Sequence, residues 1–502
     1  MPLSDYIQAP ANNTHPSYKK AFFAIGRAPE YATGEVIIAS LYREVGYKEL
    51  SEKKVPSHGT KFFNRVKSPP KMLMHRDDMI SSKAWYSIIN QVLKSPKQPN
   101  QSKKRFLQIT PLVPEASFYT SAARLKGNPW NPGALIKIIL AYGLDDPDQA
   151  ASLWNHIFEK LSVDSTDDVW ARYIAREIEC WRPSGVDYNW ELNPYNDLVN
   201  LETDVRQVTY PAKQFVKDLR CILDLKEALD RRQWISLVES ILRIGITSHV
   251  IWICSVQDKI WKAMDDALQG KTFSKGDLVK YLSIPSRGYW VHGAKAEAYI
   301  KENARNYYLA RLGINLMMHA LEDAGETGLT GSFRSLHSTC ELLNRISAMA
   351  SKIDRPKIRE KFSLLVDREP RHLSCAKGIP ANIFEFLSYT LRQRRTADEE
   401  LRSYDQGYYM RKSGLYSAAP WIVSLGPASV ISLAHCCTST SRMPKTVVDF
   451  CDHLSGYGIF VQANDVPSNE LGQTLRNLGL IVDSPDAEGG MVIVPPFQMI
   501  EQ

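Results

Sequence analysis

The residues with the most obvious potential for chemistry lie near the C-terminus. His435-Cys436-Cys437 and Cys451-Asp452-His453 bring possible zinc ligands within nineteen residues of one another. Structural zinc sites favour spacings such as C-x(2–4)-C, and adjacent cysteines on a helix point in different directions. We therefore interpret these cysteines as thiols of the protein core and predict neither a metal site nor a cofactor.

Three further patterns each lack a part that their chemistry needs. Gly270–Thr272 matches the end of a phosphate-binding P-loop, but the glycine required five residues earlier is Asp265. Glu52–Lys54 has the E-x-K spacing of metal-dependent nucleases without an upstream acid on a sheet edge to hold the metal. Ser335 and His337 lie too close together on one helix to act as nucleophile and base.

Charge is distributed very unevenly along the chain. Among all 502 residues, 62 Lys and Arg face 55 Asp and Glu, but residues 1–130 alone hold 20 cations and 9 anions. Aromatic residues lie between these cations, including Phe62, Phe63, Trp85 and Tyr86. Cations neutralise phosphates and rings stack on bases, so this pattern is typical of a nucleic-acid surface. The predicted nucleic-acid-binding residues are Lys53, Lys54, Lys61, Arg65, Lys67, Lys71, Lys103, Lys104 and Arg105.

A second interpretation of the same basic region remains open. Residues 94–104 also carry Ser, Pro, Gln and Asn, which is the composition of a flexible linker beside a solubilising face. Both interpretations predict a basic N-terminal region that differs from the rest of the chain.

Cysteine usage and hydropathy bear on location. The eight cysteines contain no CxxC pair, which indicates reduced thiols in a cytoplasmic protein, and the N-terminus lacks the pattern of a secretory signal. The 29 residues 413–441 contain no Asp, Glu, Lys or Arg. Pro420, Gly426 and Pro427 interrupt this segment, so we predict a buried strand near Trp421–Val423 and a core helix from Pro427, with no membrane span.

The periodicity predicts a mainly α fold with three parts: a basic N-terminal region (1–107), a central helical body (108–412) and a C-terminal part (413–502) that joins the uncharged segment to a winged-helix-like unit. Helices are expected to begin at Pro132 and Pro147. Another is expected from about Asp167, with an apolar face containing Val169, Trp170, Tyr173, Ile174 and Ile178. One or two helices are expected over 211–245, with a separate helix at 250–268 and a long one at 294–324.

The last sixty residues change pattern. Helices are predicted at 447–454 and 470–478, the second capped by Ser468, followed by strands at 480–482 and 491–494. This order, above all the run LGQTLRNLGLIVDSPDAEGGMVIVPP, resembles a winged-helix domain. The resemblance implies that the second helix docks into the DNA major groove. Residues 445–502 nevertheless hold two cations, Lys445 and Arg476, against eight acidic residues, so we expect this unit to contact protein instead.

Two functions follow as hypotheses. The first is a non-catalytic subunit or adaptor of a nucleic-acid-processing complex, such as a prokaryotic antiviral defence system. Its basic region would bind the DNA or RNA backbone, and its helical body and acidic C-terminal unit would bind other subunits, including an ATPase or nuclease. The alternative is a hydrolase or nuclease with a site assembled from residues distant in sequence. Candidate parts of such a site are His75, Asp77 and Asp78, which also fit a helix cap.

Overall fold

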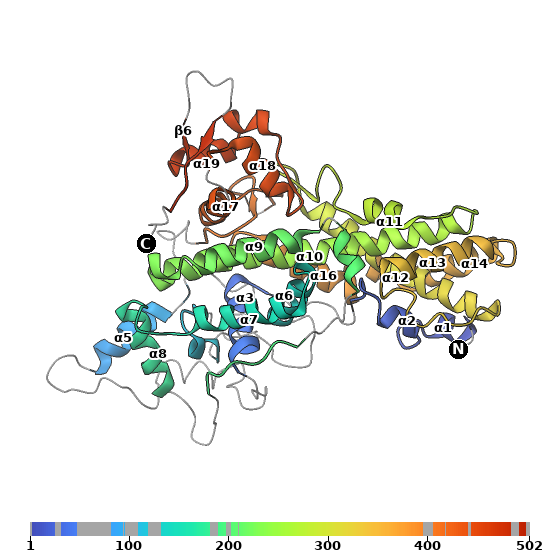
Figure 1. Ribbon diagram of the computed structural model, residues 1–502, viewed down its shortest axis with the longest axis horizontal. Coiled ribbons are helices and arrows are strands. Elements are labelled where there is room, and N and C mark those ends of the chain that lie inside the picture. The colour runs from blue at the N-terminus through green and yellow to red at the C-terminus, as the bar shows by residue number, and fades with distance from the viewer. Residues whose placement is uncertain are drawn as a thin grey trace.

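The computed structural model describes residues 3–25, 32–47, 82–93, 95, 109–118, 132–180, 189–196, 202–208, 210–394, 405–416, 418–439, 443–482 and 491–497. Helices dominate this part of the chain and its strands are two or three residues long, so the predicted mainly α class is confirmed (Figure 1). All nine cations predicted to bind nucleic acid lie outside the described residues.

The longest helix before residue 400 is α10 (Arg231–Ala267), and several of the other helices pack on it. The other helices in this part of the chain are α1 (Leu3–Gln8), α2 (Pro16–Lys19), α3 (Gly34–Gly46), α5 (Ser82–Leu93), α6 (Pro132–Gly143), α7 (Pro147–Leu161), α8 (Val169–Cys180), α9 (Pro211–Leu223), α11 (Lys275–Leu282), α12 (Glu297–Asp323), α13 (Leu336–Ala348), α14 (Arg355–Asp367), α15 (Pro370–Leu373) and α16 (Gly378–Leu391). Short 3-10 turns η1 (Pro114–Phe118), η2 (Thr203–Gln207) and η3 (Lys226–Ala228) connect them. Proline opens α6 and α7 as predicted.

The predicted break between residues 245 and 250 is wrong. Helix α10 runs without interruption through Gly245 for 37 residues, capped at its start by Asp230, whose side chain accepts from the Gln233 N–H. Gly245 is needed for close packing, because a Cβ atom there would lie 2.1 Å from the ring of Phe215 on α9. Among the described residues, α10 is the one helix long and apolar enough to cross a membrane, and its apolar window is entirely buried inside the protein.

The uncharged segment 413–441 has the predicted order of elements. Strands β2 (Met410–Lys412) and β3 (Trp421–Val423) form an antiparallel pair, with Val423 buried and the other two residues of β3 half-buried. Helix α17 (Pro427–Ser439) begins at the predicted proline and is largely buried against α9 and α10. The prediction of a strand followed by a core helix is confirmed.

The remaining C-terminal elements form a small helical unit with a three-stranded sheet. They are β4 (Lys445–Thr446), α18 (Val447–Ser455), β5 (Ile459–Phe460), η5 (Ala463–Ser468), α19 (Glu470–Asn477), β6 (Ile481–Val482) and β7 (Val492–Ile493). The sheet order is β4-β7-β6, and both pairings are antiparallel. Asn469, not Ser468, caps α19, because Ser468 belongs to the preceding 3-10 turn. Strand β5 pairs with β1 (Trp290–Val291) of the body.

Buried side chains form one large cluster and one small one. The large cluster extends from Leu3 to Ile493, so the helical body and the C-terminal unit share a core. The boundaries of the three predicted parts stay predictions. The small cluster, here called the minor cluster, consists of Tyr47, Leu93, Ile109, Leu112, Val113, Ala116, Phe118, Ala171, Ile174 and Ile178.

The close contact at Gly245 makes a testable prediction about the core. Gly245→Ala should lower the free energy of unfolding by about 1–3 kcal/mol, because the added methyl group overpacks the site against the buried Phe215 ring. The matched control is Gly276→Ala in α11, where the nearest atom to a new Cβ lies 3.9 Å away. That change should leave stability unchanged or raise it by up to about 1 kcal/mol. Urea unfolding measures both, and equal effects would contradict the packing assigned to Gly245.

Candidate functional site

The candidate site is the outward face of α8, and a single carboxylate fixes where this helix begins. The Asp168 Oδ1 atom accepts from the Ala171 N–H at 2.9 Å, which caps the first turn of α8. Its Oδ2 atom accepts from the Arg231 N–H at 3.0 Å, at the start of α10. The first N–H groups of a helix have no partner within the helix and favour a negative charge. Asp168 therefore joins the starts of α8 and α10.

A buried ion pair beside Asp168 holds the same junction together. The Arg231 guanidinium donates to Asp167 Oδ1 at 2.7 Å, and both side chains are almost completely buried. Arg231 also donates to the Leu112 carbonyl at 2.6 Å and to the Tyr42 hydroxyl at 3.2 Å. Burial raises the pKa of Tyr42, so this hydroxyl keeps its proton and donates to the Leu112 carbonyl at 3.2 Å. Segments distant in sequence thus meet at one cation.

Lys226 completes the polar network from η3. Its ammonium group donates to Asp164 Oδ2 at 2.7 Å and lies 3.2 Å from Asp167 Oδ2. Burial works against the ionised form of Asp164, but the hydrogen bonds from Lys226 and Thr166 outweigh it and hold the pKa of Asp164 well below its usual range. The turn that leads into α8 is therefore crossed by charged hydrogen bonds, which are stronger than neutral ones.

Helix α8 has a buried face and an exposed face. Ala171, Ile174 and Ile178 enter the minor cluster. On the other side, Trp170 is 52% exposed and Tyr173 is 37% exposed.

Arg172 and Arg176 are exposed as well, and neither forms an ion pair with a residue that the structure describes. A surface that combines aromatic rings with unpaired guanidinium groups can stack on bases and neutralise phosphates.

This exposed face corrects the sequence interpretation of α8. Val169, Trp170 and Tyr173 were expected on the apolar face, yet all three are exposed. The helical period of 3.6 residues puts Ala171, Ile174 and Ile178 on one stripe and turns Val169 and Tyr173 away from it. The same period puts Trp170 four residues before Ile174 on the buried stripe, so its exposure could not be found from the sequence.

The minor cluster also gathers the described residues that flank the basic segments. Tyr47 is the last described residue before the segment that holds Lys53 to Lys71. Leu93 and Ile109 stand on the two sides of the segment that holds Lys103, Lys104 and Arg105. The predicted cations themselves lie outside the described residues, as do His75, Asp77, Asp78 and Glu52–Lys54. What the structure brings together is therefore the buried side of α8 and three described residues that border the basic segments, Tyr47, Leu93 and Ile109.

The motifs set aside in the sequence have structural roles where the structure describes them. Gly270–Thr272 follows the end of α10, and Lys271 pairs with Asp266 at 2.8 Å, so no strand precedes this loop as a P-loop requires. Ser335 caps α13, and His337 pairs with Glu341. Cys436, Cys437 and Cys451 are buried, as the interpretation as core thiols predicts. Among the described residues, no three metal-ligating side chains gather at one point.

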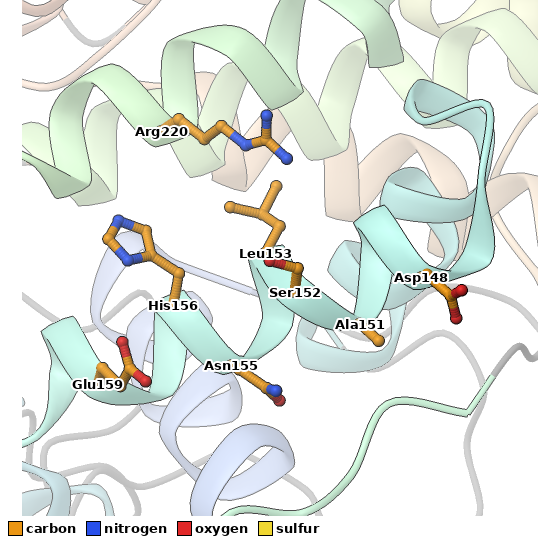
Figure 2. Close-up of a pocket in the computed structure, with 8 residues that line it drawn as sticks. All are labelled: Asp148, Ala151, Ser152, Leu153, Asn155, His156, Glu159 and Arg220. Carbon is orange, nitrogen blue, oxygen red and sulfur yellow. The ribbon is translucent and has the colours of Figure 1, made fainter.

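A hollow of about 680 Å³ on α7 was considered as a hydrolase site (Figure 2). Arg220 reaches over it from α9, while Asp148 and Asn155 point away from Arg220. His156 bonds to Asp224 at 2.9 Å, and Ser152 lies one turn earlier on α7. Within the described part of the chain, no hydrogen bond joins Ser152 to His156, so the contact between nucleophile and base that defines such a site is missing.

A second cavity, of about 490 Å³, lies beside the start of α10. Glu239 and Asp405 line it, and both pair with the fully buried Arg243, at 3.3 and 2.9 Å. Both carboxylates therefore share one cation within the protein, and the Asp405 carboxylate also accepts from the backbone N–H of Arg394. We interpret this group as a structural ion network that joins α10 to the chain around residue 405.

The buried pair at the base of α8 gives a prediction about stability. Asp167→Ala should lower the free energy of unfolding by roughly 3–5 kcal/mol, because it leaves the Arg231 charge buried without its partner. Asp224→Ala is the control: it breaks the pair with His156, in which the Asp224 side chain is 50% exposed, and should cost less than about 1 kcal/mol. Chemical denaturation measures both. A loss at Asp167 no larger than that at Asp224 would show that Arg231 does not depend on this pair.

The function of the site has to be interpreted from its own chemistry, because the comparisons with known proteins found no match. No protein-family model matches the chain, and no curated protein matches it.

Proposed function

We propose that the protein is a non-catalytic subunit or adaptor of a nucleic-acid-processing complex that binds a phosphate backbone through its basic N-terminal region and the exposed face of α8. One observation carries the proposal: Trp170, Arg172, Tyr173 and Arg176 face solvent on a helix whose buried side shares a cluster with described residues that border the basic segments, namely Tyr47, Leu93 and Ile109. Cytoplasmic location, the absence of a membrane contact and the setting of a defence complex belong to the same proposal.

The binding free energies expected for stacking and for phosphate contacts favour a site made of both the basic segments and α8. Each stacked base contributes about 1–3 kcal/mol, and each neutralised phosphate makes the affinity fall more steeply with salt. A few exposed side chains on one helix give a weak site, whereas α8 acting together with the nine cations predicted from the sequence would give a site with useful affinity. Stacking on Trp170 and Tyr173 requires unpaired bases, so the proposal favours single-stranded over duplex nucleic acid.

The C-terminal unit supports the protein-binding half of the proposal. The order α17-β4-α18-α19-β6-β7, with a β4-β7-β6 sheet, supports the resemblance to a winged helix. A winged helix that reads DNA does so with the start of the second helix of its helix-turn-helix, which corresponds to α19 here. In this chain the first residue of α19, Glu470, pairs at 2.5 Å with Arg411 of the body. The start of α19 is therefore occupied by the protein's own chain, and its charge is acidic.

Exposed apolar side chains offer this unit a different use. Met443, Val448 and Val482 are 75%, 54% and 57% exposed, within a part of the chain that carries a net negative charge. Apolar residues rimmed by polar ones are typical of protein contacts. We therefore assign this unit to the other subunits of the complex, of which an ATPase or a nuclease is the partner we expect.

The salt dependence of binding tests the nucleic-acid half. The full chain should bind a short single-stranded oligonucleotide with an affinity that falls steeply as salt rises. Neutralising Lys61, Arg65, Lys67, Lys103, Lys104 and Arg105 should remove most of that affinity at low salt. Arg172→Gln with Arg176→Gln should weaken binding and reduce the salt slope by about 0.7 for each phosphate that the variant no longer neutralises.

The matched control is Lys352→Gln with Lys357→Gln. It removes the same charge from two exposed positions, one in the turn between α13 and α14 and one in α14. These helices lie at the opposite end of the ribbon from α8 (Figure 1). The control should bind with the slope of the unmodified chain. If the arginine variant and the lysine variant lose affinity equally, binding reflects net charge alone and the assignment to α8 is wrong.

A further inference from the structure

Two thiols from distant parts of the chain meet where the C-terminal unit packs on the body. Cys221 lies in the last turn of α9 and is half-buried, whereas Cys436 on α17 is fully buried. The Cys221 Sγ atom lies 2.8 Å from the Ser439 hydroxyl, and the Cys436 thiol donates to the Asp218 carbonyl at 3.6 Å. These two contacts lie one helical turn apart on α9 and α17, and they bring the thiols close enough to influence each other's ionisation.

The surroundings give the two sulfurs different properties. The hydrogen bond from Cys436 is the largest influence on Cys221 and, with His435 and Ser439, lowers the pKa of Cys221 to about 5. Burial and the hydrogen bond to Cys221 raise the pKa of Cys436 well above its usual value. Cys221 is therefore a thiolate at neutral pH, and Cys436 keeps the proton that stabilises it.

His435 strengthens this difference. Its ring is 2% exposed and hydrogen-bonds to Cys221, yet its Nδ1 atom is buried and has no hydrogen-bond partner among the described residues. The ring also packs edge-on against Phe497, with centroids 5.3 Å apart. A buried imidazole beside a half-buried thiolate is an arrangement found in reactive cysteines.

We propose that Cys221 and Cys436 are a peroxide-sensitive thiol pair that closes to a reversible disulfide between α9 and α17. This inference is independent of nucleic-acid binding. Cys221 serves as the attacking thiolate because it is both ionised and partly accessible, and Cys436 serves as the resolving thiol because it is already in contact with Cys221.

The chemistry balances with hydrogen peroxide as the oxidant. The Cys221 thiolate attacks one peroxide oxygen, the O–O bond breaks, and the departing hydroxide takes up a proton to become water, which leaves Cys221 as a sulfenic acid. Cys436 then attacks the sulfenic sulfur, the S–O bond breaks, and the hydroxide leaves as a second water with the Cys436 proton. The two sulfurs together lose two electrons, and the peroxide gains them. Burial is the largest cause of the raised Cys436 pKa, and loss of the Cys221 charge in the first step removes a further contribution to it.

The position of the pair gives the disulfide a mechanical consequence. One turn before Cys221 on α9, the buried Asp218 carboxylate accepts from the Tyr457 hydroxyl at 2.8 Å and bonds to the His453 ring at 2.9 Å. These contacts hold α9 to the end of α18 and the turn after it, on the side where α17, α18 and α19 lie together (Figure 1). A disulfide between Cys221 and Cys436 would add a covalent link beside these hydrogen bonds. It would fix the C-terminal unit on the body.

Peptide mapping of the full chain tests the proposal. After brief exposure to hydrogen peroxide and blocking of free thiols, a peptide that links Cys221 to Cys436 should appear and should vanish on reduction. Cys436→Ala should abolish this peptide and leave Cys221 in the sulfenic or sulfinic form. The matched control is Cys437→Ala, which removes the neighbouring buried thiol and should leave the linked peptide intact.

Alkylation rates provide a second measurement that needs no variant. At pH 6, Cys221 should react with iodoacetamide about tenfold faster than an ordinary exposed thiol, because its larger thiolate fraction outweighs the lower nucleophilicity of a low-pKa sulfur. Its rate should change with pH around the pKa of about 5. The proposal is overturned if Cys221 reacts no faster than Cys375, whose pKa burial raises, or if the linked peptide contains Cys437 in place of Cys436.

Discussion

The buried contact between Arg231 and Asp167 is the constraint on which the candidate surface depends. A guanidinium group taken out of water must have its charge and its donors satisfied, and Arg231 achieves this with the Asp167 carboxylate, three carbonyls and a tyrosine hydroxyl. These acceptors come from segments far apart in the sequence. The start of α10, the end of α7, the turn before α8 and the chain around Leu112 are therefore fixed relative to one another. Through Asp168, the same junction sets where α8 begins and so which side chains it turns outward.

The two surfaces assigned to partners differ in charge and in the side chains they expose. Helix α8 presents rings and guanidinium groups beside the ends of the basic segments. The C-terminal unit is acidic, and the start of its helix α19 is held by Arg411 of the same chain. The large cluster joins the helical body to the C-terminal unit through α9, α10 and α17, whereas α8 packs on the minor cluster. Cys221 and Cys436 lie on this connection, at the contact between α9 and α17.

Local signals in the sequence predicted much of this fold, and tertiary contacts account for what was missed. Prolines at 132, 147 and 427 mark helix starts because their missing N–H and fixed φ suit the first helical position. The break expected after Gly245 does not exist, because packing against Phe215 matters more there than helix propensity. The outward positions of Val169 and Tyr173 were available from the helical period, but the exposure of Trp170 was not, because Trp170 shares its stripe with the buried Ile174 and Ile178. The pairing of Cys221 with Cys436 had no signal in the sequence, because only the packing of α9 on α17 brings them together. The nine predicted cations stay a prediction, since they lie outside the described residues.

Photochemical cross-linking of the full chain to a short single-stranded oligonucleotide, followed by peptide mapping, tests the central claim most directly. Aromatic side chains that stack on bases are the groups expected to form such links. The account predicts cross-linked peptides from α8 that contain Trp170 or Tyr173, together with peptides from the basic N-terminal segments. Cross-links concentrated in α18 and α19, or in α14, would contradict it, because the nucleic acid would then bind where the account places protein partners or no partner.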